Sequence, residues 1–233
     1  MEYPRYTARR TVLRALVKAA LFTLTDLRIE GRENIPATGP LIIIANHFHF
    51  ADPVLLAHIF PKHTEFLAGT QMPNAPTIVK GLPNLYGVIH VERGTASRAA
   101  LRESEQVLHQ NGFVGVFPEG GSWAEVLRPA RPGAAMIATL NDAPVLPVGI
   151  DGMTGLFKQR RPTVTVRIGK PIGPFKAEGR GRQRRRQLEE IGESMMRAIA
   201  DLLPPEQHGV FSADARLREE AQAVADFPYH DLN

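Results

Sequence analysis

Short apolar runs alternate with longer polar stretches along most of this chain, and this alternation predicts its secondary structure. Unbroken apolar runs of this length are typical of strands buried on both faces of a sheet. We place strands at 41–45, 64–69, 86–91, 113–117, 144–150 and 162–168. Helical periodicity between the strands is clearest at 97–110 and 133–140. The pattern predicts an α/β fold with a largely parallel mixed sheet flanked by helices.

The amino-terminal segment carries a further helical pattern. Its apolar residues recur at helical spacing and are Leu13, Leu16, Val17, Ala20, Leu21 and Leu24. A basic ladder runs beside them, formed by Arg10, Arg14 and Lys18. The segment is a poor candidate for a membrane span, because Lys18 and Asp26 bracket only seven uncharged residues and a spanning helix needs about 20. We expect either an interfacial helix whose arginines reach lipid phosphates or a helix packed on the core.

Candidate chemistry begins directly after the first predicted strand, in the sequence Asn46-His47-Phe48-His49-Phe50-Ala51-Asp52. His47 and Asp52 can meet only if the chain turns between them. Asp52-Pro53 is typical of a helix start, with Asp52 at the N-cap. The aspartate can then accept the histidine N–H, which fixes the tautomer and leaves the other nitrogen as a base. The two residues alone also allow a simple helix cap and a polar strand end.

Further blocks follow in a fixed order. They are Gly87-Val88-Ile89-His90-Val91-Glu92-Arg93-Gly94, Gly115-Val116-Phe117-Pro118-Glu119-Gly120-Gly121-Ser122, then 127–135 and 143–150. Together with the His47 block they resemble, in order and interval, the glycerolipid acyltransferase family. Its best-known members are the 1-acylglycerol-3-phosphate acyltransferases. The resemblance covers about residues 30 to 203.

The resemblance implies roles for the residues that match. His47 resembles the family's general base, which takes the proton from an acceptor hydroxyl as that hydroxyl attacks an acyl thioester, and Asp52 resembles the residue that orients it. Arg93 matches an arginine of the second block that helps to bind the acceptor phosphate. Glu119 and Gly120 match the third block, which shares in acceptor binding.

The third block also departs from the family pattern. The family commonly has Thr-Arg after the Glu-Gly, whereas Gly121-Ser122-Trp123 follows here, so one expected cation near the acceptor is missing. Backbone N–H groups of Glu119, Gly120 and Gly121 can still donate to an oxyanion or a phosphate, because glycine lets a backbone approach an anion closely. An ordinary glycine-rich turn would have the same sequence.

Composition narrows the reaction further. The chain has no cysteine and no Gly-x-Ser-x-Gly elbow. A covalent acyl-enzyme is therefore not indicated, and a direct attack on a thioester needs mainly a base and stabilisation of the oxyanion. We expect the thioester of acyl-CoA or acyl carrier protein as co-substrate, and no cofactor.

Two other functions stay open from the residues alone. His47, His49 and Asp52 could bind a metal ion in a metal-dependent hydrolase, although no other histidines have ligand spacing. The net charge of +4 and the basic run at 180–186 could also mark a non-catalytic protein that binds lipid or nucleic acid. That run has no interleaved aromatic residues to stack bases, so we expect no nucleic acid partner.

We therefore expect an O-acyltransferase of phospholipid synthesis that acylates a hydroxyl of a lysophospholipid-like acceptor, most simply 1-acylglycerol-3-phosphate. Residues 1–29 should form the amphipathic helical segment, 30–203 the acyltransferase domain and 204–233 a polar tail. The protein should lie on the cytoplasmic face of a membrane, as a peripheral protein in contact with surface lipids. We expect no metal ion in the site.

Overall fold

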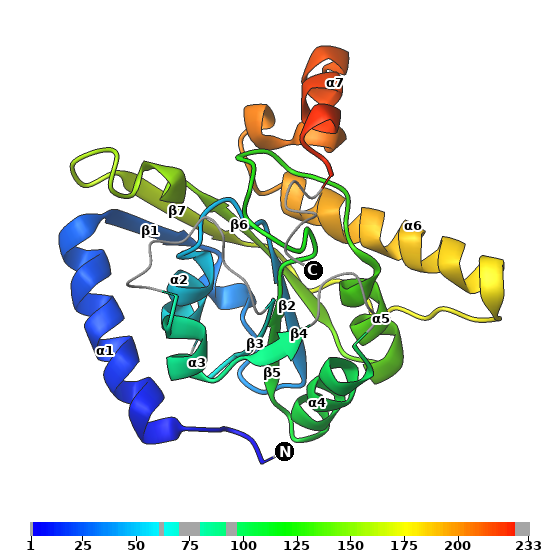
Figure 1. Cartoon of the computed structure of the whole chain (residues 1–233), viewed down its shortest axis with the longest axis horizontal. Helices are drawn as coiled ribbons and strands as arrows, with labels where there is room; N and C mark the ends of the chain where they lie inside the picture. Colours follow the sequence, from blue (N-terminus) through cyan, green and yellow to red (C-terminus); the bar gives the residue numbers. More distant parts are fainter. Residues whose placement is uncertain (1, 61–62, 70–79, 92–96, 227–233) are drawn as a thin grey trace.

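A central sheet organises the protein, as the computed structural model shows for residues 2–60, 63–69, 80–91 and 97–226 (Figure 1). The described strands form one sheet of seven in the order β1-β7-β6-β2-β5-β3-β4. Neighbouring strands are parallel except for β6 and β7, which are antiparallel. Their bounds are Asp26–Glu30 (β1), Leu41–Ala45 (β2), Glu65–Gly69 (β3), Ile89–Val91 (β4), Phe113–Val116 (β5), Val145–Asp151 (β6) and Thr163–Ile168 (β7).

Helices cover both faces of the sheet. In Figure 1, α1 to α3 lie on one side of it and α4 to α6 on the other. Short 3-10 turns and α7 follow α6, at the carboxyl-terminal end of the described chain. The helix bounds are Thr7–Leu24 (α1), Asp52–Ile59 (α2), Leu82–Tyr86 (α3), Arg98–His109 (α4), Pro132–Asn141 (α5), Gly181–Ala200 (α6) and Ala215–Ala223 (α7). None of these helices has the length and hydropathy needed to cross a bilayer.

The central strand β2 separates two hydrophobic cores. Successive strand residues point to opposite faces of a sheet, so Ile42 and Ile44 join the cluster beneath α4 to α6, whereas Leu41 and Ile43 join the cluster beneath α1 and α2. All four side chains are fully buried. This double burial explains why the strand is an unbroken apolar run in the sequence. It also places the carboxyl end of β2, where the His47 block begins, in the middle of the sheet.

The predicted fold class is confirmed, and each predicted strand overlaps an observed one. The strand predicted at 86–91 is shorter than expected, because Leu82–Tyr86 forms α3 and Gly87 ends that helix in the left-handed region (φ 80°). The edge strand β1 was not predicted. It lies across the expected boundary at residue 30, and its half-buried Leu27 and Ile29 alternate with exposed charged residues.

The arginines of α1 do not lie where the sequence suggested. Arg10 is fully buried, and its guanidinium donates to both carboxylate oxygens of Glu65 at 2.7 and 2.8 Å. Arg14 donates to the carbonyl of Phe60 at 2.7 Å, at the end of α2. The expectation that these two arginines reach lipid phosphates is therefore wrong. They join α1 to the protein, and several of the apolar residues of α1 face outward instead, namely Val12, Leu16, Phe22 and Leu24.

The Glu65 carboxylate should make the attachment of α1 sensitive to acid. Burial alone would raise the pKa of Glu65, but hydrogen bonds from Arg10 and Arg5 outweigh burial and hold the pKa below its ordinary value of 4.5. A carboxyl group whose pKa is lowered by folding stabilises the folded state above its unfolded pKa. That stabilisation is lost as the pH falls through the lower, folded pKa.

We predict that Glu65→Gln reduces the free energy of unfolding by about 3–5 kcal/mol, because removal of one partner leaves buried charge uncompensated. The variant should also lose part of the decline in stability that the parent protein shows below pH 4.5. Denaturant unfolding between pH 3 and about pH 7 measures both effects. Glu190→Gln, in an exposed pair with Arg186, is the matched control and should change neither. Equal pH profiles for parent and Glu65→Gln would contradict this account.

Candidate active site

His47 and Asp52 form a hydrogen-bonded pair just beyond the carboxyl end of β2. Nδ1 of His47 lies 3.0 Å from Oδ2 of Asp52. The carboxylate is fully buried, whereas the imidazole is 16% exposed. An ionised carboxylate only accepts hydrogen bonds, so Nδ1 carries the proton and Nε2 keeps its lone pair. The pair therefore has the orientation that a histidine general base requires.

Asp52 differs from its predicted position by one residue. It is the first residue of α2, with Ala51 as the N-cap, and no side chain caps this helix. Its Oδ2 atom also accepts the backbone N–H of His49 at 2.8 Å. The carboxylate is thus directed back over the 47–49 turn. The simple helix-cap interpretation of Asp52 is wrong, and the carboxylate instead holds the turn that carries His47.

Glu119 lies behind His47. It follows β5, the parallel neighbour of β2, so the carboxyl ends of the two strands bring Glu119 and His47 together. Its Oε1 atom accepts the backbone N–H of His47 at 2.8 Å. Burial raises the pKa of the Glu119 carboxyl, and the neighbouring Arg128 guanidinium opposes this rise. The hydrogen bond to His47 directs the Glu119 carboxylate at the backbone of the site. Glu119 is not among the residues that line the pocket described below.

Arg128 is a site residue that the sequence did not identify. It is 1% exposed, its Nη2 lies 2.8 Å from Oε2 of Glu119, and its Nε donates to the same oxygen at 2.9 Å. Nη2 also donates to the carbonyls of Gly121 at 2.6 Å and His47 at 3.3 Å. The guanidinium stacks on Trp123, 3.8 Å from the ring centroid. One buried cation thus joins the turn after β2 to the turn after β5.

Two more contacts brace this arrangement. Asn46 is fully buried, and its side-chain amide exchanges hydrogen bonds with the backbone of Ile150 on β6, at 2.7 and 2.8 Å.

The loop that carries Arg128 is held from the other side by the carboxyl-terminal segment. Leu127 donates to the carbonyl of Gln207 and accepts from the N–H of Val210. The expected polar tail therefore packs against the loop of the site.

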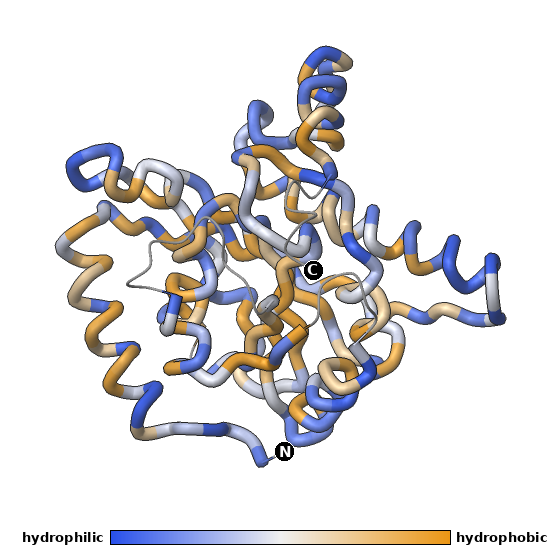
Figure 2. The backbone as a smooth tube through the Cα atoms, in the orientation of Figure 1, coloured by the Kyte–Doolittle hydropathy of each residue, from blue (hydrophilic) through white to orange (hydrophobic). Residues whose placement is uncertain are grey.

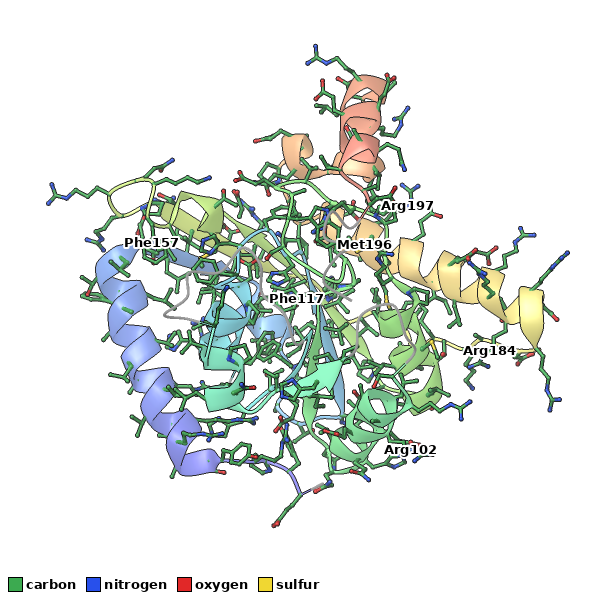
Figure 3. All side chains as sticks on the ribbon, viewed as in Figure 1. Arg102, Phe117, Phe157, Arg184, Met196 and Arg197 are labelled. Atoms are coloured by element: carbon green, nitrogen blue, oxygen red, sulfur yellow. The ribbon has the colours of Figure 1, made fainter. Side chains whose placement is uncertain are left out.

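A cavity of about 720 Å³ opens beside His47, within the size range of small-molecule sites. Phe117, near the centre of the molecule in Figure 3, packs against the His47 ring at 4.3 Å between centroids. The walls are mostly apolar. One part is lined by Leu13, Val17, Val54, Ala57, Tyr86 and Val88, and another by Ala100, Leu101, Ala134, Met136 and Ile137. Such a cavity suits a long apolar chain with a polar group near the imidazole.

The other predicted site residues have different outcomes. Gly120 and Gly121 line the cavity next to His47, and Gly120 has a positive φ of 82°, which glycine adopts without strain. Arg93 lies outside the described residues. Arg131, which the sequence did not single out, is an exposed cation that lines the same cavity.

The metal-ligand interpretation of His47, His49 and Asp52 gains no support from the geometry. Oδ2 of Asp52 is occupied by two N–H donors, and Nδ1 of His49 accepts the N–H of Ala51 at 3.3 Å. Burial lowers the pKa of His49. In the described part of the chain, no three histidine, aspartate or glutamate residues are grouped so that they could hold a metal ion. The turn is instead organised by the hydrogen bonds of Asp52 to the His47 ring and to the backbone of His49.

Fold and site together define an α/β enzyme with an oriented histidine beside an apolar cavity. Residues 26–151, more than half of the chain, match the family model described as Acyltransferase. The chain belongs to this family, and the resemblance to the glycerolipid acyltransferases is confirmed.

Individual relatives carry related names. The chain is 24% identical over 160 residues to the 1-acyl-sn-glycerol-3-phosphate acyltransferase of Bacillus subtilis, covering 67% of this chain and 78% of that protein. It is 30% identical over 157 residues to the enzyme of the same name from Saccharomyces cerevisiae, covering 63% and 52%. The crystal structure of the 1-acyl-sn-glycerophosphate (LPA) acyltransferase PlsC from Thermotoga maritima is similar, with a TM-score of 0.58 and 27% identity. That match covers 87% of this chain and 84% of the other.

We predict that Arg128→Met lowers both stability and activity. Loss of one partner from a buried ion pair costs about 3–5 kcal/mol, and the carbonyls of His47 and Gly121 lose their donor. Glu119→Gln combined with Arg128→Met should recover much of the stability, because removing both charges of a buried pair is often nearly neutral. Denaturant unfolding and enzyme turnover are measured on the same preparations. Arg182→Met, at an exposed site on α6, is the control. A double variant no more stable than Arg128→Met would contradict the pairing.

Proposed function

We propose that this protein transfers a fatty acyl chain from the thioester of acyl-CoA or acyl carrier protein to a hydroxyl of a lysophospholipid-like acceptor. The observation that carries the proposal is the His47–Asp52 pair at 3.0 Å, beside an apolar cavity. The names of the relatives make 1-acylglycerol-3-phosphate the first acceptor to test. The reaction would then belong to phospholipid synthesis.

The reaction needs one proton to move twice. Nε2 of His47 takes the proton of the acceptor hydroxyl as its oxygen bonds to the thioester carbonyl carbon. The Asp52 carboxylate stabilises the imidazolium that forms. Collapse of the tetrahedral intermediate breaks the carbon–sulfur bond, and the imidazolium returns the proton to the leaving thiolate. The products are an ester and a free thiol, and His47 is again neutral.

The turn after β5 offers donors for the charge that develops on the carbonyl oxygen. The N–H of Gly120 is already bonded to the carbonyl of Phe117 at 3.0 Å. The N–H of Gly121 has no such bond within the described residues, and Gly121 lines the cavity beside His47. We assign the oxyanion contact to this N–H, because a preorganised backbone donor costs no reorganisation during the reaction. In this scheme Glu119 positions the backbone of His47 and does not touch the acceptor.

Arg131 is the best placed described residue to bind an acidic headgroup. Arg131 directly precedes α5, and its side chain lines the cavity next to Gly120. The family pattern has an arginine shortly after the Glu-Gly, where this chain has Gly121-Ser122-Trp123. We propose that Arg131 supplies the missing positive charge, together with Arg93. A guanidinium binds phosphate oxygens in a bidentate manner, which suits this role.

The surface of α1 supports a location at a lipid interface. Phe22 is 79% exposed and Leu16 is 63% exposed, on a helix that also contributes Leu13 and Val17 to the cavity. A lysophospholipid resides in a bilayer, so a cavity that adjoins an apolar surface can receive it without exposing its chain to water. We therefore propose peripheral attachment, with surface lipids as partners, at the cytoplasmic face where acyl thioesters are available.

We predict that the purified protein releases free thiol from acyl-CoA only when an acceptor is present. His47→Ala should reduce the rate by about a hundred- to ten-thousand-fold, which is the usual contribution of a positioned general base. Asp52→Asn should also be impaired, since an amide can present its N–H and favour the wrong tautomer. Thiol release is followed with a chromogenic reagent. His109→Ala, an exposed histidine on α4, is the control. Full activity of folded His47→Ala would refute the mechanism.

We also predict that the acceptor carries a phosphate. A panel of lysolipids with and without phosphate should show faster acylation of the phosphate-bearing members, and Arg131→Ala should reduce that preference mainly through KM, because it removes binding in the ground state. Arg131→Lys should keep part of the preference, since the charge remains. Equal preference in the parent and Arg131→Ala would show that Arg131 does not bind the acceptor phosphate. It would not contradict the role of His47 as the base.

A further inference from the structure

One exposed aromatic residue stands apart from the site and from α1. Phe157 lies in the connection between β6 and β7 and is 71% exposed. Among the described residues, only Phe22 of α1 is a more exposed large hydrophobic residue. Figure 3 shows Phe157 near the tip of this connection, on the same side of the molecule as α1. An exposed phenylalanine is unremarkable by itself, so its setting decides its meaning.

The connection holds Phe157 outward. Met153 and Leu156, which precede it, are 2% and 7% exposed and are anchored in the core. The turn is closed by the N–H groups of Leu156, Lys158 and Gln159, which donate to carbonyls of Met153 and Gly155. Phe157 itself has a φ of 72°, which is rare and costly for a bulky residue. Backbone strain of this kind persists where the surrounding structure fixes it, and it motivates a search for function.

The connection that carries Phe157 contacts both the end of α1 and the wall of the cavity. Nη2 of Arg161 lies 3.4 Å from the carbonyls of Phe22 and Thr25, at the end of α1. The Phe157 ring is parallel to the ring of Phe50, with centroids 6.4 Å apart, and Phe50 lines the cavity. The connection that carries Phe157 therefore contacts the end of α1 at Phe22, and Phe157 itself packs beside the wall of the cavity at Phe50. Figure 2 shows α1 as mainly hydrophobic along most of its length, although it lies at the edge of the molecule.

Residues 156–161 and α1 carry only basic charges of their own. The segment 156–161 contains Lys158, Arg160 and Arg161 and no acidic residue, and α1 likewise contains none. Lys158 pairs with Glu125 at 3.2 Å, and Arg161 donates to carbonyls at the end of α1. Both residues and Arg160 are exposed. Apolar side chains flanked by cations fit a bilayer with anionic headgroups, which attract each nearby Lys or Arg.

We propose that residues 156–161 form a second membrane contact, with Phe157 inserted into the interface of an anionic bilayer beside Phe22. This inference rests on the proposed function. Two contacts, at α1 and at Phe157, fix the tilt of the protein on the membrane as well as its attachment. The wall of the cavity at Phe50 then faces the lipid, so the acceptor enters from the bilayer and not from water.

The absence of cysteine makes a direct test simple. Phe157→Cys and Phe22→Cys are each labelled with an environment-sensitive fluorophore, and Leu140→Cys, a 51% exposed site on α5, is the control. Vesicles of phosphatidylglycerol should shift the emission to the blue at 157 and 22 and leave 140 unchanged. Phosphatidylcholine vesicles should give a much smaller shift. A shift at 22 alone would overturn the proposal, and so would a shift that depends on protein concentration without vesicles, which would indicate a second copy of the chain on this surface.

A second measurement separates this inference from the proposed reaction. Phe157→Ser should lower the vesicle partition coefficient by roughly ten- to a hundred-fold, the factor expected when a phenylalanine ring is no longer buried in an apolar phase. It should slow acylation of acceptor held in vesicles and leave the rate with a dispersed short-chain acceptor unchanged. Leu140→Ser should alter neither. Loss of both rates in folded Phe157→Ser would show that Phe157 acts in the reaction and would overturn the proposal. An unchanged partition coefficient would show that Phe157 does not contact the membrane, and it would not contradict the proposed reaction.

Discussion

The buried ion pair between Glu119 and Arg128 is the interaction on which the site depends. Glu119 holds the N–H of His47, and Arg128 donates to its carbonyl, so both polar groups of one backbone residue are fixed by one pair. A buried ion pair adds little net stability, because desolvation offsets the attraction. Its value here is geometric. It joins the ends of β2 and β5, and Asp52 then needs only to orient a ring whose backbone is already in place.

The same arrangement bears on the departure in the third sequence block. An arginine is missing after the Glu-Gly, yet Arg128 donates to the carbonyl of Gly121 within that block, and Arg131 lines the cavity beside it. Arg128 is buried and holds the backbone, whereas Arg131 is exposed and lines the cavity. Both residues belong to the loop that leads into α5.

The strands other than β1 and the His47–Asp52 pair were predictable because both follow from local order in the sequence. Buried parallel strands are unbroken apolar runs, and a strand followed by a turn and a helix start brings the two side chains together. Arg128 was not predictable, because no sequence pattern pairs it with Glu119. The two side chains meet only when the loop between them folds back. The positions of the α1 arginines were predicted wrongly for a related reason. Helical periodicity shows which residues share a face of the helix, but it does not show what that face packs against. Arg10 binds Glu65, which lies on β3, far from α1 in the sequence.

The register of the first strand has a consequence for how the chain assembles. β1 begins at Asp26 and pairs with β7, from Thr163 onward, so the first of the described strands pairs with the last of them. Pairings between segments so far apart in sequence form late, because loop closure must precede any gain in energy. α1 can be attached sooner, because Arg10 and Arg14 bind Glu65 and Phe60, which come about a hundred residues before β7 in the chain. The sheet is therefore completed at β1 only after the helix that precedes this strand already has its partners in the protein.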